Sequence, residues 1–544
     1  MTVSRRGLLS ALLGAPLAAP LVATGCKEPT RAFAGEVRGA AHEVGHRLRE
    51  AWYERASGDP ERVGVAIVGA GPAGLSAGWR LARSGYRDFR IFDLEPQAGG
   101  TSTYGTDGSV PYPWGAHYVP VPLEGNRALR ILLDEMGVLT GDPGPPTARE
   151  RFRIREPEER IFIDGRWHVG LFPAEGASDQ DWSELRRFEQ RMDQWAGVRD
   201  ASGRRAFALP LRRSSDDAKL VELDRLSAAD WFKQEGFRSE RLRWYLELAC
   251  RDDYGLALTQ TSAWALLFYF CARRAHADSE SQPFVSWSEG NGRLVQHLAR
   301  QCQGRIETGS LVTDVLPAED QVRLAVFSAE TGKLRPLHAE HVILAVPQFV
   351  AARVLRPWRD AKPAHLQAFS YGPWLVANLH LRREPKSSGA PLAWDNVLYD
   401  SPSLGYVSAR HQALRDLGPD VWTYYLPLTG DDVRRDRERL LENDHTTWSN
   451  AIVGDLSQAH PDLAEHLERI DLYKWGHAMV RPTPGFLLGA GRKAALGAQL
   501  DRVHFAHSDL SGIALFEEAQ DRGVLAAERA LARLGRPAEP LATG

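Results

Sequence analysis

Cysteine is scarce in this sequence. Four cysteines occur in 544 residues, and apart from Cys26 near the N-terminus they are the widely spaced Cys250, Cys271 and Cys302. Three scattered cysteines do not make a disulfide framework. No CxxC spacing of a structural zinc site is present either. We therefore predict a chain without a disulfide scaffold and without a metal site.

The sequence also lacks a basic cluster, an internal repeat and, after its first 26 residues, any apolar run long enough for a membrane helix. The formal net charge is -3, so the electrostatic signature of a nucleic-acid-binding protein is missing. With 43% hydrophobic and 25% charged residues, the composition is that of an ordinary soluble enzyme. The length predicts two or three domains, or one large fold with insertions.

The N-terminal segment has the pattern of an export signal. Arg5 and Arg6 precede a short apolar run, which is too rich in Ala, Gly and Pro to span a bilayer well. We exclude residues 1–26 from fold reasoning for this reason. The arginine pair resembles the twin-arginine class of signals, and the small residues that end at Cys26 resemble a lipobox, with Ala23 where leucine is usual. We expect an exported protein of the periplasm or cell envelope, lipid-anchored at Cys26. The alternative is a frayed amphipathic N-terminus.

A strand, a glycine turn and a helix follow. Val65–Val68 is a continuous apolar run, typical of a buried parallel strand. Gly69 then permits a tight turn, Gly71 lets the backbone approach a pyrophosphate, and Gly74 lets the helix pack close to the strand. The positive end of the helix dipole, with Ala73 in the first turn, faces the phosphates in such a turn. The pattern predicts a dinucleotide site.

An acidic residue completes this unit. A second short apolar strand ends in Asp93, 19 residues after Gly74, where dinucleotide folds place the acid that binds the ribose hydroxyls. Glu95 lies two residues later, before Pro96. We predict Asp93 as the ribose ligand because it directly follows the strand, and keep Glu95 as the alternative.

The next motif is Gly99-Gly100-Thr101. With it, the sequence resembles the FAD-dependent amine oxidase superfamily, which includes phytoene-desaturase-like and protoporphyrinogen-oxidase-like relatives. In that family an acid, a short spacer, a Gly-Gly pair and usually an arginine follow the first βαβ unit, and here Thr101 stands in place of the arginine. The resemblance implies that the glycine pair lets the backbone approach the pyrophosphate and ribityl chain of FAD.

Two later segments extend the resemblance. The sequence WGAHYV at 114–119 is similar to the family segment whose backbone lies against the flavin ring, which implicates Gly115, Ala116 and His117. The strand around Val312 is similar to the one whose backbone meets the adenine.

The C-terminal block departs from the family pattern. His507-Ser508 occupies the place of a Gly-acid pair, which leaves Asp509 as the nearest carboxylate. On the helix that follows, Glu518 replaces a glycine, whereas Ala519 and Gly523 are kept. The resemblance implies cofactor contacts from Asp509 and Ala519.

The resemblance covers about residues 63–535 and implies an α/β fold, in which a Rossmann-type FAD-binding domain is interleaved with an α+β substrate-binding domain. We expect a signal, a tether and then alternating FAD-binding and substrate-binding parts, with the boundaries 1–26, 27–62, 63–149, 150–283, 284–349, 350–475 and 476–544.

Few side chains are expected to act in the chemistry, because a flavin carries it. In many amine oxidases a lysine near the flavin holds a water, and Trp374 stands where that lysine would be. Residues 473–485 resemble the segment whose aromatic residue walls the substrate cavity. This implicates Trp475 and, as an acid or base near neutral pH, His477. Core packing is the alternative for both.

Two acids interrupt an aromatic helical region at 243–270. Asp252 and Asp253 follow Arg251 between two apolar helical patterns. They could line a cavity, or one of them could cap the second helix at its N-terminus. The pattern favours the cap.

These observations predict an exported FAD-dependent oxidoreductase that transfers a hydride from an amine or apolar substrate to the flavin, and passes electrons to oxygen or a quinone. FAD is expected to be non-covalent, since no cysteine or histidine stands in the expected place for a covalent link. One alternative is a flavin-dependent desaturase or isomerase of a lipid or isoprenoid, which Trp374 favours. The other is a non-catalytic flavin-binding envelope protein, which the altered segment at Asp509 favours.

Overall fold

The computed structural model describes residues 31–541, apart from 50–55, 142–144, 278, 414, 416 and 499. The predicted signal, with Arg5, Arg6 and Cys26, lies outside the described residues. From Phe33 onward the chain forms one unit. Within the described part, no helix is both long and apolar enough to cross a membrane.

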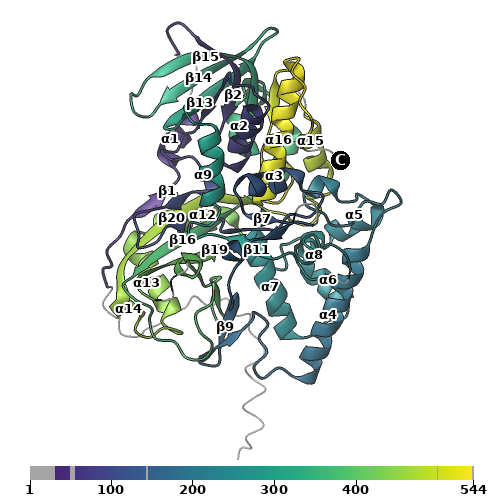
Figure 1. Cartoon of the computed structure of the whole chain (residues 1–544), viewed down its shortest axis with the longest axis vertical. Helices are drawn as coiled ribbons and strands as arrows, with labels where there is room; N and C mark the ends of the chain where they lie inside the picture. Colours follow the sequence, from purple (N-terminus) through teal and green to yellow (C-terminus); the bar gives the residue numbers. More distant parts are fainter. Residues whose placement is uncertain are drawn as a thin grey trace, which may run out of the picture. The chain divides into compact units, whose positions relative to one another are not determined.

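The first sheet contains the apolar strands predicted from the sequence. It lies in the upper part of Figure 1 and has a parallel centre, because β2 pairs in parallel with β3 and with β15. The buried run Val65–Ile67 belongs to β2 and has no exposed surface. In order across the sheet the described strands are β12 (Ile306–Glu307), β3 (Phe89–Phe92), β2 (Glu61–Val68), β15 (Leu334–Leu344), β14 (Val322–Ser328) and β13 (Ser310–Pro317), with β21 (Val503–Phe505) paired to β15.

Helices from distant parts of the chain pack together beside this sheet. The helix α2 (Pro72–Arg83) lies against the C-terminal helix α16 (Phe516–Arg533), as Figure 1 shows. The two backbones approach closely because Gly523 has no side chain: a Cβ there would lie 2.1 Å from the carbonyl oxygen of Ala73. The helices that join them are α3 (Arg127–Glu135), against α16, and α9 (Gly292–Gln301), against α2.

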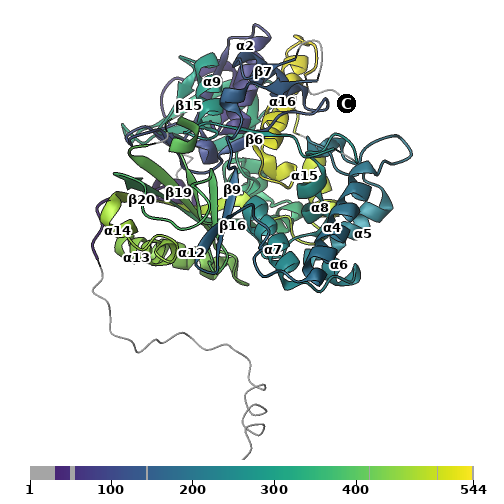
Figure 2. The same ribbon diagram turned by 60° about the horizontal axis from the view of Figure 1, so that its bottom comes forward.

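The second sheet is built mainly from the later half of the chain. Three helices cover one of its faces in Figure 2: α12 (Val433–Glu442), α13 (His445–Leu456) and α14 (Leu463–His466). In order the described strands are β1 (Val37–Gly39), β20 (Leu467–Val480), β16 (Tyr371–Leu381), β19 (Asp420–Pro427), β18 (Tyr406–Ser408), β17 (Asp395–Leu398), β9 (Glu159–Ile163) and β10 (Arg166–Val169).

A group of helices forms the other part of the substrate side. Serine side chains accept hydrogen bonds from the first turns of four of them, which satisfies backbone N–H groups that a helix leaves free at its start. The helices are α4 (Asp179–Gly197), α5 (Ala218–Arg225), α6 (Ala228–Gln234), α7 (Glu240–Tyr254) and α8 (Ala263–Cys271).

Short elements connect these parts. They are α1 (His42–His46), β4 (Tyr104–Gly105), β5 (Tyr112–Pro113), β6 (Tyr118–Pro120), β7 (Leu139–Thr140), β8 (Thr147–Ala148), β11 (Phe284–Ser286), α10 (Gln348–Val354), α11 (Arg356–Asp360) and α15 (Ala490–Gly497).

The region predicted as a tether contains regular structure. Strand β1 adds to the edge of the second sheet by pairing in parallel with β20. Beyond it, the N–H of Ala41 donates to the carboxylate of Glu95 at 2.9 Å, just after β3 of the first sheet. This segment therefore contacts both sheets.

The predicted fold class is confirmed. The first sheet takes strands from three separate stretches of the chain, and the stretches between them supply the helices α4 to α8 and the second sheet apart from β1. The predicted boundary at residue 475 falls inside β20, which belongs wholly to the second sheet.

Candidate functional site

A bare backbone cradle lies at the start of α2. Gly71 is the N-cap of the helix and has an extended backbone conformation. No side chain caps the first N–H groups of the helix. Gly100 faces it: a Cβ on Gly100 would lie 3.1 Å from the Cα of Gly71, whereas a Cβ on Gly71 would meet nothing closer than 3.8 Å. Uncapped N–H groups at a helix start, with open space in front of them, fit a pyrophosphate.

The other two glycines of the first motif shape the turn itself. Gly69 has a φ of +99°, which favours glycine. At Gly74 a Cβ would lie 1.8 Å from the carbonyl oxygen of Gly69, so any side chain there would push α2 away from the strand.

Asp93 supports this turn from the end of β3. Its carboxylate accepts the N–H of Ala70 at 2.5 Å and that of Glu95 at 2.8 Å. Burial raises its pKa, and burial raises the pKa of Glu95 to about 7. Val312 is buried in the same core as the end of β3. The structure thus places both candidate ribose ligands and Val312 at one edge of the sheet, and the ribose role itself stays a prediction.

Asp509 lies in the short 3-10 helix Ser508–Leu510 that follows β21, and it is fully buried. Its Oδ2 accepts hydrogen bonds from the N–H of Gln348 and the hydroxyl of Tyr371, each at 2.7 Å. Its Oδ1 has no hydrogen-bond partner among the described residues, since the nearby Nδ1 of His507 accepts the N–H of Asp509. One oxygen therefore fixes the fold, and the other lies 3.1 Å from Nδ1 of His507; the contact of Asp509 with a cofactor stays a prediction.

Replacing Asp509 by alanine is expected to lower the free energy of unfolding by about 3 kcal/mol, because the N–H of Gln348 and the hydroxyl of Tyr371 would both lose a charged partner in the interior. The matched variant Asp509→Asn keeps an acceptor and should lose clearly less. Urea unfolding of both variants checks this. Equal losses for the two would contradict the structural role of the carboxylate.

The departure at Glu518 has a structural reason. Its Oε1 accepts the N–H of Leu211 at 2.5 Å, and one turn later Asp521 pairs with Arg212 at 2.9 Å. These carboxylates join α16 to the stretch before α5. Ala519 is buried in the core shared by α2 and α16.

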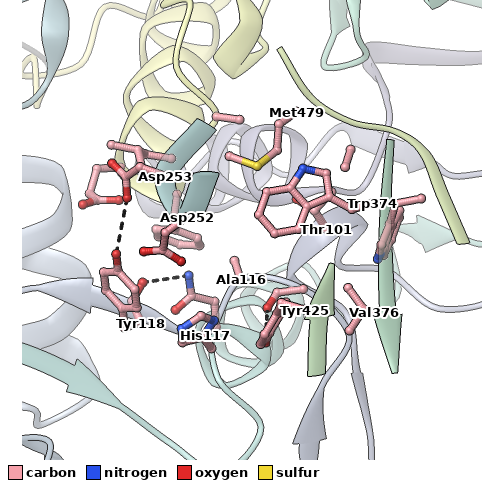
Figure 3. A pocket seen from close by; sticks show the side chains of 18 of the residues that line it. Thr101, Ala116, His117, Tyr118, Asp252, Asp253, Trp374, Val376, Tyr425 and Met479 are labelled. Atoms are coloured by element: carbon pink, nitrogen blue, oxygen red, sulfur yellow. Dashed lines mark hydrogen bonds between the residues drawn. The ribbon is translucent and has the colours of Figure 1, made fainter. Parts of the chain in front are cut away.

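Next to the cradle a cavity opens between the segment 115–118, the second sheet, the end of α7 and the start of α16 (Figure 3). Six of the residues predicted from the sequence line it: Thr101, Gly115, Ala116, His117, Trp374 and Trp475. Others that line it were not predicted as site residues: Tyr118, Arg273, Asn291, Tyr425, Met479 and Glu517.

The Gly-Ala segment presents bare backbone to this cavity. Gly115 passes so close to Thr101 that a Cβ would lie 2.2 Å from the Thr101 carbonyl oxygen. The hydroxyl of Tyr425 donates to the carbonyl oxygen of Gly115 at 2.8 Å, and the N–H of Asn291 donates to that of Ala116 at 3.0 Å. These bonds hold the segment rigid. A glycine-alanine backbone leaves a flat surface that a planar ring system fits.

Two tryptophans form the opposite aromatic wall. Trp374 on β16 and Trp475 on β20 are paired across the sheet. The indole N–H of Trp475 donates to the carbonyl oxygen of Trp114 at 2.8 Å, and its ring stacks on Tyr473 at 4.0 Å. Trp374 packs over Gly255, where a Cβ would lie 2.5 Å from its indole nitrogen. The tryptophan that replaces the expected lysine is therefore built into the wall.

The two histidines differ in their positions. His117 lies in the cavity wall between the rings of Trp394 and Tyr425, and burial lowers its pKa to about 4. His477 does not line the cavity. It stacks on Phe349 at 4.6 Å, and burial lowers its pKa to about 4 as well. His477 thus lies outside the residues that line the cavity, and its role as an acid or base stays a prediction.

The favoured reading of the acids in 251–254 as a cap was wrong. Helix α7 continues to Tyr254, so Asp252 and Asp253 lie in its last turn, and Ser262 caps α8. Both acids line the cavity. A polar interruption in an apolar pattern has the same appearance for a cap and for a cavity wall, which is why the local sequence did not separate them.

One motif bears on the prediction of no metal site. Residues 42–46 read HEVGH, the HExxH spacing that places two histidines on one face of a zinc-binding helix. In α1 the rings of His42 and His46 lie 5.6 Å apart. Over the described residues, no group of three or more His, Cys, Asp or Glu side chains is placed to hold a metal ion.

Comparison with known proteins agrees with this geometry. The sequence model of a family described as flavin containing amine oxidoreductase matches residues 72–531. A search of the curated proteins gives no match.

Three solved structures share the fold. A putrescine oxidase with bound putrescine is 18% identical over 87% of this chain and 100% of its own, with a TM-score of 0.62. The cyclohexylamine oxidase from Brevibacterium oxydans IH-35A is 17% identical over 87% of this chain and 100% of its own, with a TM-score of 0.61. A CLA-producing fatty acid isomerase from P. acnes is 14% identical over 85% of this chain and 97% of its own, with a TM-score of 0.57.

Proposed function

Because this chain belongs to the family of flavin-containing amine oxidoreductases and is a flavin-dependent oxidoreductase, we propose that it binds FAD non-covalently and oxidises a small amine. We propose further that it is exported and passes electrons to oxygen or a quinone.

One observation carries the proposal. The uncapped glycine cradle at Gly71 and Gly100 is continuous, through Thr101, with the bare backbone of Gly115 and Ala116 in the cavity wall. A dinucleotide with a planar ring at one end fits such a path. When bound, the flavin supplies an acceptor for a hydride.

The side chains around the cavity position and shield the substrate. Trp374 and Trp475 present large apolar surfaces that exclude water from the reacting carbon. Tyr425 fixes the backbone against which the ring lies. The described cysteines Cys250, Cys271 and Cys302 are buried and do not line the cavity, which supports non-covalent binding.

A desaturase or isomerase of an unsaturated lipid is the second candidate. Trp374 in place of the lysine of many amine oxidases favours it, and the fold is shared with a fatty acid isomerase. The carboxylates of Asp252, Asp253 and Glu517 in the cavity wall argue against a substrate with a carboxylate head group.

Anaerobic mixing of the flavin-loaded protein with a panel of substrates tests the proposal. Amines are expected to bleach the visible absorbance of the oxidised flavin, and unsaturated fatty acids and isoprenoids are not. Bleaching by lipids alone would favour the second candidate. A flavin that no substrate reduces would favour a non-catalytic envelope protein.

Export is tested separately in the producing cell. The variant with Arg5 and Arg6 both replaced by lysine is expected to accumulate in the cytoplasm, and Cys26→Ala is expected to leave the membrane fraction. An unchanged distribution of both variants would contradict the export and anchor proposals.

A further inference from the structure

Three carboxylates gather at one end of the cavity. Asp252 and Asp253 come from the last turn of α7, and Glu517 comes from the first turn of α16. In Figure 3 the two aspartates lie on one side of the view, whereas Trp374 and Met479 lie on the other. The cavity therefore has an acidic end and an aromatic end.

One cation faces these carboxylates. Arg273 is 5% exposed and lies 3.5 Å from Asp253. Its guanidinium also lies over the rings of Tyr118, Tyr269 and Phe284, at 5.6, 5.5 and 5.3 Å. Arg273 can neutralise one carboxylate, so the acidic end keeps an excess of negative charge when the acids are ionised.

Two carboxylate oxygens there have no partner. Asp253 is 5% exposed and Glu517 is 2% exposed, and Oδ2 of the first and Oε1 of the second have no hydrogen bond within the described part of the chain. A buried polar atom without a partner is costly and rare in native proteins. Since both residues line the cavity, a donor on a ligand is the simplest partner for these oxygens.

The negative charge extends beyond the cavity wall. Asp252 interacts electrostatically with Glu159, and both interact with Asp395. Burial raises the pKa of Asp252 and that of Glu159 to about 7. A line of carboxylates that repel one another in this way is stabilised by a cation that enters among them.

We propose that the acidic end, at Asp252 and Glu517, binds an ammonium group of the substrate other than the amine that is oxidised. The substrates are then diamines or longer polyamines, with one ammonium group among the carboxylates and the reacting carbon at the aromatic end. This inference rests on the proposed amine oxidation. A metal ion is the poorer occupant, because among the described residues no three His, Cys, Asp or Glu side chains, these carboxylates included, are placed to hold a metal ion.

Binding tests the inference without turnover. We compare putrescine with butylamine, and diaminohexane with hexylamine, by calorimetry on the flavin-loaded protein under anaerobic conditions. At least one diamine is expected to bind about tenfold or more tightly than the monoamine of equal length, which is about 1.4 kcal/mol. Equal affinity for both members of every pair would overturn the inference.

Charge-neutral variants locate the site. Asp252→Asn and Glu517→Gln are each expected to weaken diamine binding about tenfold or more and to change monoamine binding less than about twofold. Glu330→Gln, in an exposed turn between β14 and β15, is the matched control and should change neither. Equal weakening of both amines would contradict the inference. So would loss of flavin from Glu517→Gln, since the carboxylate would then hold the cofactor.

The pH dependence gives a readout that a structural role would not produce. Burial raises the pKa of Glu517, like that of Asp252, to about 7, whereas alkyl ammonium groups lose their proton near pH 10. Diamine affinity is therefore expected to rise between pH 6 and pH 8, as the acids ionise and the ligand stays dicationic. The charged and titratable groups that face these two acids are Tyr118, Glu159, Asp253, Tyr269, Arg273, Asp395, Tyr425 and Glu518.

The stability of the ligand-free protein is expected to fall as pH rises, whereas diamine affinity rises. An acid whose folded pKa is raised contributes stability at low pH that is lost as pH rises through the folded pKa. Asp252→Asn should therefore raise the Tm relative to the unsubstituted protein, and raise it more at pH 8 than at pH 5, because most of the loss falls between pH 5 and the folded pKa. A fall in Tm at both pH values would show a structural carboxylate and overturn the inference.

The two proposals fail in different ways. If diamines bind selectively and the variants lose this binding, yet no amine bleaches the flavin, the acidic site stands and amine oxidation does not. If monoamines and diamines both bleach the flavin and bind with equal affinity, amine oxidation stands and the acidic site does not.

Discussion

Replacing Gly71 by valine is expected to give a folded protein that retains less than about a tenth of the flavin. Gly71 has a φ of -74°, which valine adopts without strain, and a Cβ there meets no protein atom closer than 3.8 Å. The new side chain instead fills the space in front of the uncapped N–H groups of α2, where a pyrophosphate fits. The flavin-to-protein absorbance ratio after purification measures the effect, and the Tm of flavin-free protein confirms the fold.

Gly74→Ala is the contrasting variant. Its Cβ would lie 1.8 Å from the carbonyl oxygen of Gly69, so the strand, turn and helix must move apart. We expect a lower Tm and a lower yield of folded protein together with flavin loss. A Gly71→Val protein that keeps a full complement of flavin would contradict the location of the cradle.

Replacing Arg273 by methionine is expected to lower the free energy of unfolding by about 3–5 kcal/mol, as for other buried charges that lose their partner. Methionine fills much of the same volume among the rings of Tyr118, Tyr269 and Phe284. The main loss is the cation, which lies near Asp253 and offsets part of the rise that burial causes in the pKa of Asp252 and of Glu517.

Two further measurements separate charge from packing at Arg273. Adding Asp253→Asn to Arg273→Met should recover a substantial part of the lost stability, since one unpaired charge is removed. The Tm difference between Arg273→Met and the unsubstituted protein should widen from pH 5 to pH 8, because the remaining acids ionise over that range. A loss that is independent of pH and of Asp253 would show that packing dominates.

The parts of the site that sequence predicted are those in which a local pattern sets the geometry. Gly69, Gly71 and Gly74 are separated by fixed short spacings, follow an apolar strand and precede a helix, so one segment specifies the whole turn. Gly115 and Ala116 were implied by a short motif in the same way, and they line the cavity. Trp475 was implied by a local motif as well. It lies on the continuous strand β20, whose position sets where its side chain meets the cavity.

The acidic end could not be predicted, because tertiary packing brings its members together. Asp252 and Glu517 belong to helices from different parts of the chain, and neither helix alone shows that they face one cavity. His477 shows the reverse case. Its segment was placed correctly beside the cavity, yet its side chain packs on Phe349 instead of lining the wall.

The most direct test of the account is anaerobic reduction of the flavin by a primary amine with and without deuterium at the carbon that bears the nitrogen. We expect the amine to bleach the oxidised flavin and deuterium to slow the bleaching, because the C–H bond supplies the hydride. Flavin that no amine reduces, or that an unsaturated lipid reduces in place of amines, would contradict it.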